Sequence, residues 1–237
     1  MDDITSQFVA VYNEIDVWLR GRSKAAHEQG FTRLVDAVSH SHPGAKRHSQ
    51  TLKRLATLRN FVVHEHRHQA PLAAATQHAL KQLIKIRNEL VSPPLLLSIS
   101  NRPVELCRPD DPIGQAVKLM HDGSFSQLPV YEGQRFIGLL TAETVARWLA
   151  SSFAGGQQLV EEKPVAEVLL HQEYPGNHVF VTRTASVFDA LAEFDKSLRR
   201  GARLDAILLT ESGRATEAPI GIITIHDIPK IHRAIVT

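Results

Sequence analysis

The sequence predicts an α+β protein, in which an N-terminal all-α helical bundle precedes a tandem pair of β-α-β-β-α units. Apolar residues recur every three to four positions through the first 90 residues, which is typical of amphipathic helices. Beyond Ser92-Pro93-Pro94 they gather in short strand-like runs, and the order of these runs occurs twice. The expected domains are 1–92 for the bundle, 93–150 and 164–237 for the two units, and 151–163 for a linker containing Gly155-Gly156.

Composition is that of an ordinary globular protein. The chain has 237 residues, of which 43% are hydrophobic and 22% charged, enough for one large or two modest domains. No apolar run reaches bilayer length, and Met1-Asp2-Asp3 opens no signal-peptide core, so we expect a cytoplasmic protein with no membrane partner. The single cysteine, Cys107, excludes an internal disulfide and a cysteine-based zinc cluster.

Charge is distributed unevenly along the chain. Residues 1–90 hold 13 Lys and Arg against 8 Asp and Glu, and eight of the 13 histidines, whereas residues 91–237 hold 14 basic against 17 acidic residues. This asymmetry indicates two domains with different partners.

Four helices are expected in the bundle. The first three follow apolar positions within 8–19, 31–38 and 52–62, and a polar loop, Ser41 to Gly44, separates the second from the third. Gln69-Ala70-Pro71 ends the third helix, and the fourth is expected from about Leu72 to Leu90.

The two later units share one order of elements. In the first unit the pattern predicts a strand, a helix, a strand, a tight turn, a strand and a helix, at 104–107, 110–120, 128–131, 132–135, 136–140 and 142–150. In the second unit the expected strands and helices lie at 178–181, 185–198, 206–209, 221–223 and 225–234. Corresponding positions are offset by 74 at Ile113, by 78 at Leu128 and by 83 at Gly138, so two loop insertions account for the difference.

The last strand of each unit runs into a turn of similar sequence. Gly138-Leu-Leu-Thr141-Ala-Glu-Thr144 in the first unit corresponds to Gly221-Ile-Ile-Thr224-Ile-His-Asp227 in the second. An apolar strand can flank a base, a threonine hydroxyl can meet a phosphate, and an aspartate can accept from both ribose hydroxyls. The same residues also suit a helix cap with Thr at the N-cap and Asp at N3.

This duplicated unit, with Leu128-Pro129-Val130 before the hairpin and G-h-h-T-x-x-D after it, resembles the CBS (cystathionine-β-synthase) domain over about residues 93–237. Two such domains normally pack as a Bateman module. The resemblance implies a ligand-sensing regulatory module that binds AMP, ADP, ATP or a related adenosyl ligand such as S-adenosylmethionine, and that requires no cofactor.

The resemblance also assigns roles to residues of the second unit. It implies that Thr224 reaches phosphate, that Asp227 holds the ribose and that His226 approaches phosphate. The base is expected to be lined by Val179, Leu204, Ala206 and Ile222, and Asp205 is a further expected binding residue. The first unit keeps Thr141 but has Thr144 in place of the aspartate. Loss of charge-assisted bonds costs about 1.5–3 kcal/mol, so we expect one dominant site, in the second unit.

The third helix carries two overlapping motifs. Arg59-Asn60-x-x-x-His64 resembles the HEPN family of helical bundles, which often dimerise and some of which are metal-independent ribonucleases. In that interpretation Arg59 holds a phosphate, Asn60 positions the substrate and His64 acts on the 2′-hydroxyl or the leaving oxygen. RNA is then a further partner beside the adenine nucleotide and a second copy of the chain.

His64-Glu65-x-x-His68 is also an H-E-x-x-H zinc pattern, with Glu89 at the usual distance for a third ligand. Arg67 inside the motif and Pro71 just after it disfavour a zinc hydrolase. The simplest interpretation of this helix remains structural, with Leu55, Leu58 and Val62 in a core and the basic residues in solvent.

Overall fold

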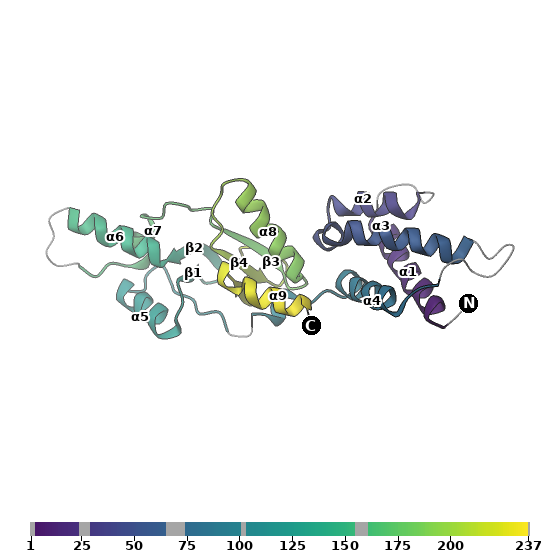
Figure 1. Cartoon of the computed structure of the whole chain (residues 1–237). Helices are drawn as coiled ribbons and strands as arrows, with labels where there is room; N and C mark the ends of the chain where they lie inside the picture. Colours follow the sequence, from purple (N-terminus) through teal and green to yellow (C-terminus); the bar gives the residue numbers. More distant parts are fainter. Residues whose placement is uncertain (1–2, 24–28, 65–73, 101–102, 155–160, 237) are drawn as a thin grey trace. The chain divides into compact units, whose positions relative to one another are not determined.

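The computed structural model describes residues 3–23, 29–64, 74–100, 103–154 and 161–236, apart from the side chains of His64, Ala154 and Val236. It divides into two compact units, Met1–Pro94 and Leu95–Thr237 (Figure 1). Within the described ranges, no helix is both long enough and apolar enough to cross a bilayer.

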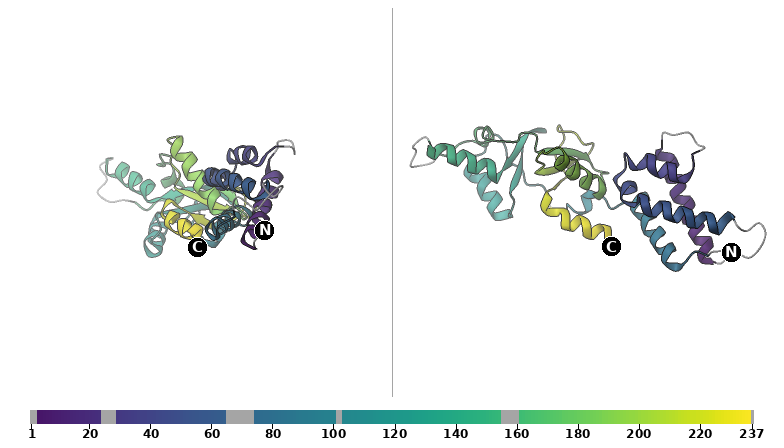
Figure 2. Two further views of the ribbon diagram at one scale, coloured as in Figure 1. Left: turned by 45° about the vertical axis from the view of Figure 1, so that its right-hand side comes forward. Right: turned by 45° about the horizontal axis from the view of Figure 1, so that its top comes forward.

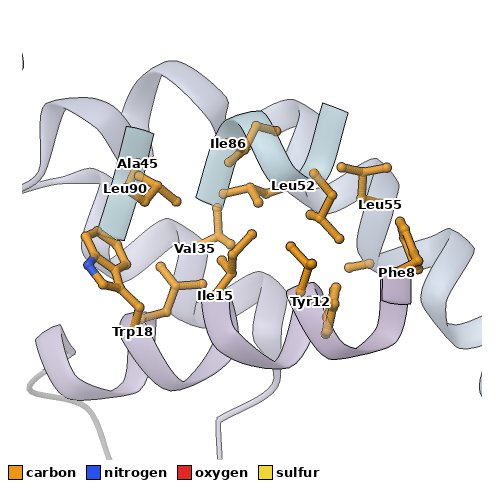
Figure 3. Close-up of a cluster of buried hydrophobic side chains, with 14 of the residues drawn as sticks. Phe8, Tyr12, Ile15, Trp18, Val35, Ala45, Leu52, Leu55, Ile86 and Leu90 are labelled. Atoms are coloured by element: carbon orange, nitrogen blue, oxygen red, sulfur yellow. The ribbon is translucent and has the colours of Figure 1, made fainter. Parts of the chain in front are cut away.

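The described residues of the first unit form a bundle of four helices, as predicted: α1 (Asp3–Arg22), α2 (Phe31–Ser39), α3 (Pro43–His64) and α4 (Gln77–Val91). Their apolar faces form one core, in which Phe8, Ile15, Val35, Ala45 and Leu52 are fully buried (Figure 3). α2 packs on α3, and α1 packs on α4. The periodicity of the sequence therefore identified the faces that meet.

Two helix starts in this unit differ from the sequence prediction. α3 already begins at Pro43, a residue that suits the first helical turn because its missing N–H has no partner there. The fourth helix was expected from Leu72, which lies outside the described residues, but residues 74–76 are not helical. α4 begins at Gln77 because the Thr76 side chain caps it, accepting from the amide of Ala79 at 3.1 Å.

The first half of the second unit consists of α5 (Ile113–Gly123), β1 (Gln127–Glu132), β2 (Arg135–Thr141) and α6 (Ala142–Ala154). β1 and β2 form an antiparallel hairpin, whose turn places Gly133 at a φ of 62°. The predicted strand 104–107 was wrong in extent, because only Cys107 pairs. Its N–H donates to the carbonyl of Pro129 at 3.1 Å, and its carbonyl accepts from Tyr131 at 3.0 Å.

The second half consists of β3 (His178–Thr182), α8 (Val187–Arg199), β4 (Ala206–Thr210), β5 (Gly221–Ile223), the 3₁₀ turn η3 (Ile225–Asp227) and α9 (Ile228–Val236). Its sheet has the order β3-β4-β5, with β3 parallel and β5 antiparallel to β4. α8 and α9 pack against this sheet around a common apolar core (Figure 2). The final helix predicted from Ile225 is thus divided into η3 and α9.

The two halves exchange their leading segments. Residues 95–100, with the 3₁₀ turn η2 (Leu96–Ser98), precede the first half but place Leu96 and Ile99 in the core of the second half. In return α7 (Val165–Leu169), which the sequence did not predict, places Val165 and Val168 in the core of the first half. The core of each half is therefore completed by a segment that precedes the other half in the sequence. The segment that follows the helical bundle is packed in the core of the second half.

Candidate functional site

The second unit contains a cavity of about 510 Å³ between its two halves. The first half contributes the end of α5 and the start of β1, including Phe125 and Gln127, while the second half contributes β5, η3 and α9. The leading segment adds Ile99 and Ser100. A volume of this size suits a small-molecule ligand.

The aspartate of the repeated turn lies in the wall of this cavity. One oxygen of Asp227, Oδ2, accepts from the amide of Thr224 at 3.0 Å and from its hydroxyl at 3.2 Å. The other, Oδ1, accepts from Nζ of Lys230 at 2.6 Å. The carboxylate therefore caps the start of η3 and also lines the cavity.

Electrostatics keep this carboxylate ionised. Burial by itself would raise the pKa of Asp227, but the hydrogen bonds from Lys230 and from the Thr224 amide outweigh it and hold the pKa below its usual range. Its side chain is 17% exposed, against 51% for Lys230. The cavity thus offers a hydrogen-bonded anion next to a half-exposed cation, with His226 on the same wall.

The sequence-predicted residues separate into two groups. Ile222, Thr224, His226 and Asp227 all line the cavity. The wall does not include Val179, Leu204, Asp205, Ala206 or Thr141. Ala206 is fully buried in β4, the central strand, and Leu204 belongs to the core of the second half. Thr141 and Asp205 line a separate small hollow.

Several wall residues were not among the sequence-predicted set: Ser100, Glu105, Phe125, Gln127 and Lys230. The spacing of Lys230, three residues after Asp227, places it on the same helical face and could have identified it. The others come from the first half and the leading segment. Their approach to β5 depends on how the halves pack, and the periodicity of one element carries no information about that.

The corresponding turn of the first half borders a hollow of only about 10 Å³. The hydroxyl of Thr141 accepts from the amide of Thr144 at 3.1 Å, and the two hydroxyl oxygens are 2.9 Å apart. Both side chains are buried. The Thr141 hydroxyl therefore caps the start of α6, and Thr144 brings no charged group to this turn.

The motif residues of the helical unit lie near the end of α3. The guanidinium of Arg59 lies over the ring of Tyr12, 5.6 Å from its centroid, and Asn60 is exposed. The side chain of His64 and all of His68 lie outside the described residues. Glu89 is buried and pairs with Nε2 of His48 at 2.6 Å, so it joins α4 to α3. The described part of the chain contains no cluster of metal-ligating side chains.

Residues 97–151 match the family model of the CBS domain. The chain thus contains a CBS domain over the first half of the second unit, as the resemblance predicted. A search of curated proteins found no match.

Solved structures similar to this chain carry CBS domains. The CBS domain of a CBS-domain-containing membrane protein from Sphaerobacter thermophilus is 20% identical, with a TM-score of 0.43, and the match covers 65% of this chain and 95% of that one. CBSX2 in complex with AMP is 13% identical, with a TM-score of 0.44, over 61% and 99% of the two chains. The CBS domain pair of MJ0100, in complex with 5′-methylthioadenosine and S-adenosyl-L-methionine, is 17% identical, with a TM-score of 0.41, over 60% and 97%.

Proposed function

We propose that this protein is a ligand-sensing regulator that binds an adenosine nucleotide in the cavity between the two halves of its second unit. The observation that carries the proposal is the cavity itself. It brings together a part-buried, ionised Asp227, the hydroxyl-bearing Thr224, the cation of Lys230, the imidazole of His226 and the apolar Ile222. These groups match a ribose, a phosphate and a base, in that order.

Ligand binding is expected to change the partners of Asp227. In the structure Lys230 donates to Oδ1 of Asp227. The two ribose hydroxyls would take over this oxygen as donors, and Lys230, which is half exposed, would be released toward the phosphate. The bond from the Thr224 amide to Oδ2 would persist and keep the carboxylate oriented.

A short stretch of backbone connects the helical unit to the cavity wall. α4 ends at Val91, and only a few residues later Ile99 and Ser100 form part of the cavity wall. A ligand that contacts this wall favours one arrangement of the leading segment and so shifts the population of states available to the bundle. We propose that the bundle is the output element and that it acts as a homodimer.

Isothermal titration of AMP, ATP and S-adenosylmethionine into the full chain tests the proposal. We expect one site per chain for at least one of these ligands. Asp227→Asn should weaken binding about ten- to a hundredfold, because it removes about 1.5–3 kcal/mol of charge-assisted hydrogen bonding. Thr144→Ala is the matched control, since it changes the corresponding position of the first half, and it should leave the affinity unchanged.

Two results would contradict the proposal. One is the absence of binding by all three ligands at millimolar concentration. The other is undiminished binding by Asp227→Asn in protein whose thermal unfolding shows an intact fold.

A further inference from the structure

The small hollow of the first half corresponds, position by position, to the large cavity of the second half. The offset of 83 relates Thr141, Glu143, Thr144 and Arg147 to Thr224, His226, Asp227 and Lys230, and the offset of 78 relates Arg203 to Phe125. Each set lines its own space, yet one space measures about 10 Å³ and the other about 510 Å³. Something other than the backbone framework therefore fills the first.

Arg203 makes the contacts that close the hollow. Its Nε donates to Oδ1 of Asp205 at 2.7 Å, and its Nη1 pairs with the carboxylate of Glu143 on α6. The guanidinium also lies over the ring of Tyr174, 5.8 Å from the centroid. This planar cation, whose side chain is 40% exposed, thus has three contacts at the position that corresponds to Phe125 of the large cavity.

Neighbouring side chains extend this contact into a network that spans both halves. Arg147 of α6 pairs with Glu143 at 3.3 Å. It also pairs with the carboxylate of Glu173, which lies between α7 and β3. The side-chain amide of Asn177 donates to Oδ2 of Asp205 at 2.6 Å. The network therefore joins α6 of the first half to the segments before β3 and β4 of the second.

The network also contacts the large cavity. Gln127, whose side chain lines that cavity, donates through Nε2 to the carbonyl of Asp205 at 3.0 Å. One hydrogen bond therefore connects a residue that lines the large cavity to a residue that lines the hollow.

We propose that the first half holds a latent nucleotide pocket, which the side chain of Arg203 and its carboxylate partners fill permanently. The proposal rests on the proposed nucleotide function of the large cavity. In this latent pocket, the ion pairs of Arg203 connect the two halves, as a bound ligand would. The single-site behaviour of the protein then depends on Arg203 as well as on the missing aspartate at Thr144.

The two causes predict different outcomes when residues of the second half are copied into the first. If Thr144 alone prevents binding, Thr144→Asp suffices to create a second site. If Arg203 fills the pocket, Thr144→Asp still shows one site, and the combined variant Thr144→Asp, Glu143→His, Arg203→Phe shows two. Each of these substitutions introduces the residue found at the matching position of the large cavity.

The test is isothermal titration of wild type, Thr144→Asp and the triple variant with AMP and with adenosine, which lacks the phosphate and therefore avoids repulsion by the remaining carboxylates. The expected stoichiometries are one, one and two ligands per chain. A second site in Thr144→Asp alone, or a stoichiometry of one in a folded triple variant, would overturn the inference. Absence of binding by wild type would instead count against the proposed function of the large cavity.

A milder variant guards against misfolding of the triple variant. Thr144→Asp with Arg203→Ala keeps the pair between Arg147 and Glu143, and circular dichroism establishes its fold. It should bind two equivalents of adenosine, the second at least tenfold more weakly because the wall lacks the aromatic ring that Phe125 supplies in the large cavity. Failure of this folded variant to take up a second equivalent also overturns the inference.

Discussion

At the scale of single residues, the difference between the two turns depends on how many bonds one side chain can accept. Asp227 divides its two oxygens between the backbone of its own turn and Lys230, so one oxygen can change partner while the other keeps the turn closed. Thr144 has a single hydroxyl, which already lies 2.9 Å from that of Thr141. This one difference therefore separates a cap with a charged group at the cavity wall from a cap that has only hydroxyl groups.

His178 is a histidine packed among aromatic rings, and this environment should make the stability of the protein depend on pH. Its ring packs against Phe136 at a centroid distance of 4.6 Å and against Phe180 at 5.6 Å, and its buried Nδ1 has no hydrogen-bond partner within the described residues. Burial lowers the pKa of His178. Protonation would place a charge among aromatic rings that connect the two halves.

The pH dependence of stability follows from this lowered pKa. The unfolded chain binds the proton near pH 6.5 and the folded chain only at lower pH, so acidification through this range favours unfolding. We expect the unfolding midpoint in urea to fall between pH 7 and pH 5, and His178→Gln to reduce this fall. The exposed His121 is the control, because His121→Gln should retain the wild-type profile. An unchanged pH profile in His178→Gln would contradict the assignment.

At the scale of elements, β5 depends on the segment that follows the helical bundle. The Ser100 hydroxyl accepts from the amide of Ile222 at 3.1 Å, so a side chain satisfies one backbone group at the free edge of this strand. A Cβ at Gly221 would lie only 2.9 Å from this oxygen. Glycine is required there because the leading segment approaches the strand so closely.

The matched position in the first half provides a control for this contact. Gly221→Ala should destabilise the protein by about 1–3 kcal/mol, because Ser100 must move and its bond to Ile222 is strained. At Gly138 the nearest atom to an added Cβ is Leu169 Cδ1 at 3.4 Å, so Gly138→Ala should be nearly neutral. Urea denaturation of both variants measures the difference, and equal stabilities would show that the approach of Ser100 is not a constraint.

At the scale of the whole molecule, the second unit should fold as a single domain, because each half completes its core with a segment that precedes the other half. Residues 95–100 complete the core of the second half, and α7 completes the core of the first. The whole cavity wall is drawn from residues 99–230. Nucleotide binding should accordingly require no residue of the helical unit.

A truncated chain of residues 95–237 tests this division. It should bind the nucleotide with an affinity within about threefold of the full chain, since 1.4 kcal/mol corresponds to a tenfold change and no wall contact is lost. Side-by-side titrations of the two proteins measure this. A tenfold loss in folded, truncated protein would contradict this prediction and would show that the bundle stabilises the ligand-binding state of the second unit.

Much of the fold followed from local patterns. Three-to-four periodicity identified the four bundle helices, and the repeated order of apolar runs identified strands β1 to β5, because each element buries a face that its own sequence defines. The strand at 104–107 was overpredicted because apolar alternation does not show whether a partner strand has free backbone groups along its length. α7 has five residues, too few for a periodic signal.

The sequence by itself determined the two-unit organisation, the paired turns and the change from Asp227 to Thr144, since these are properties of spacing and residue type along one chain. Only the tertiary structure decided which cavity walls meet. It brought Phe125, Gln127 and Ser100 to face Asp227, and it placed Arg203 in the hollow beside Thr144. The reason is that these contacts arise from packing between segments about 60 to 130 residues apart, and local sequence preferences act only over a few residues.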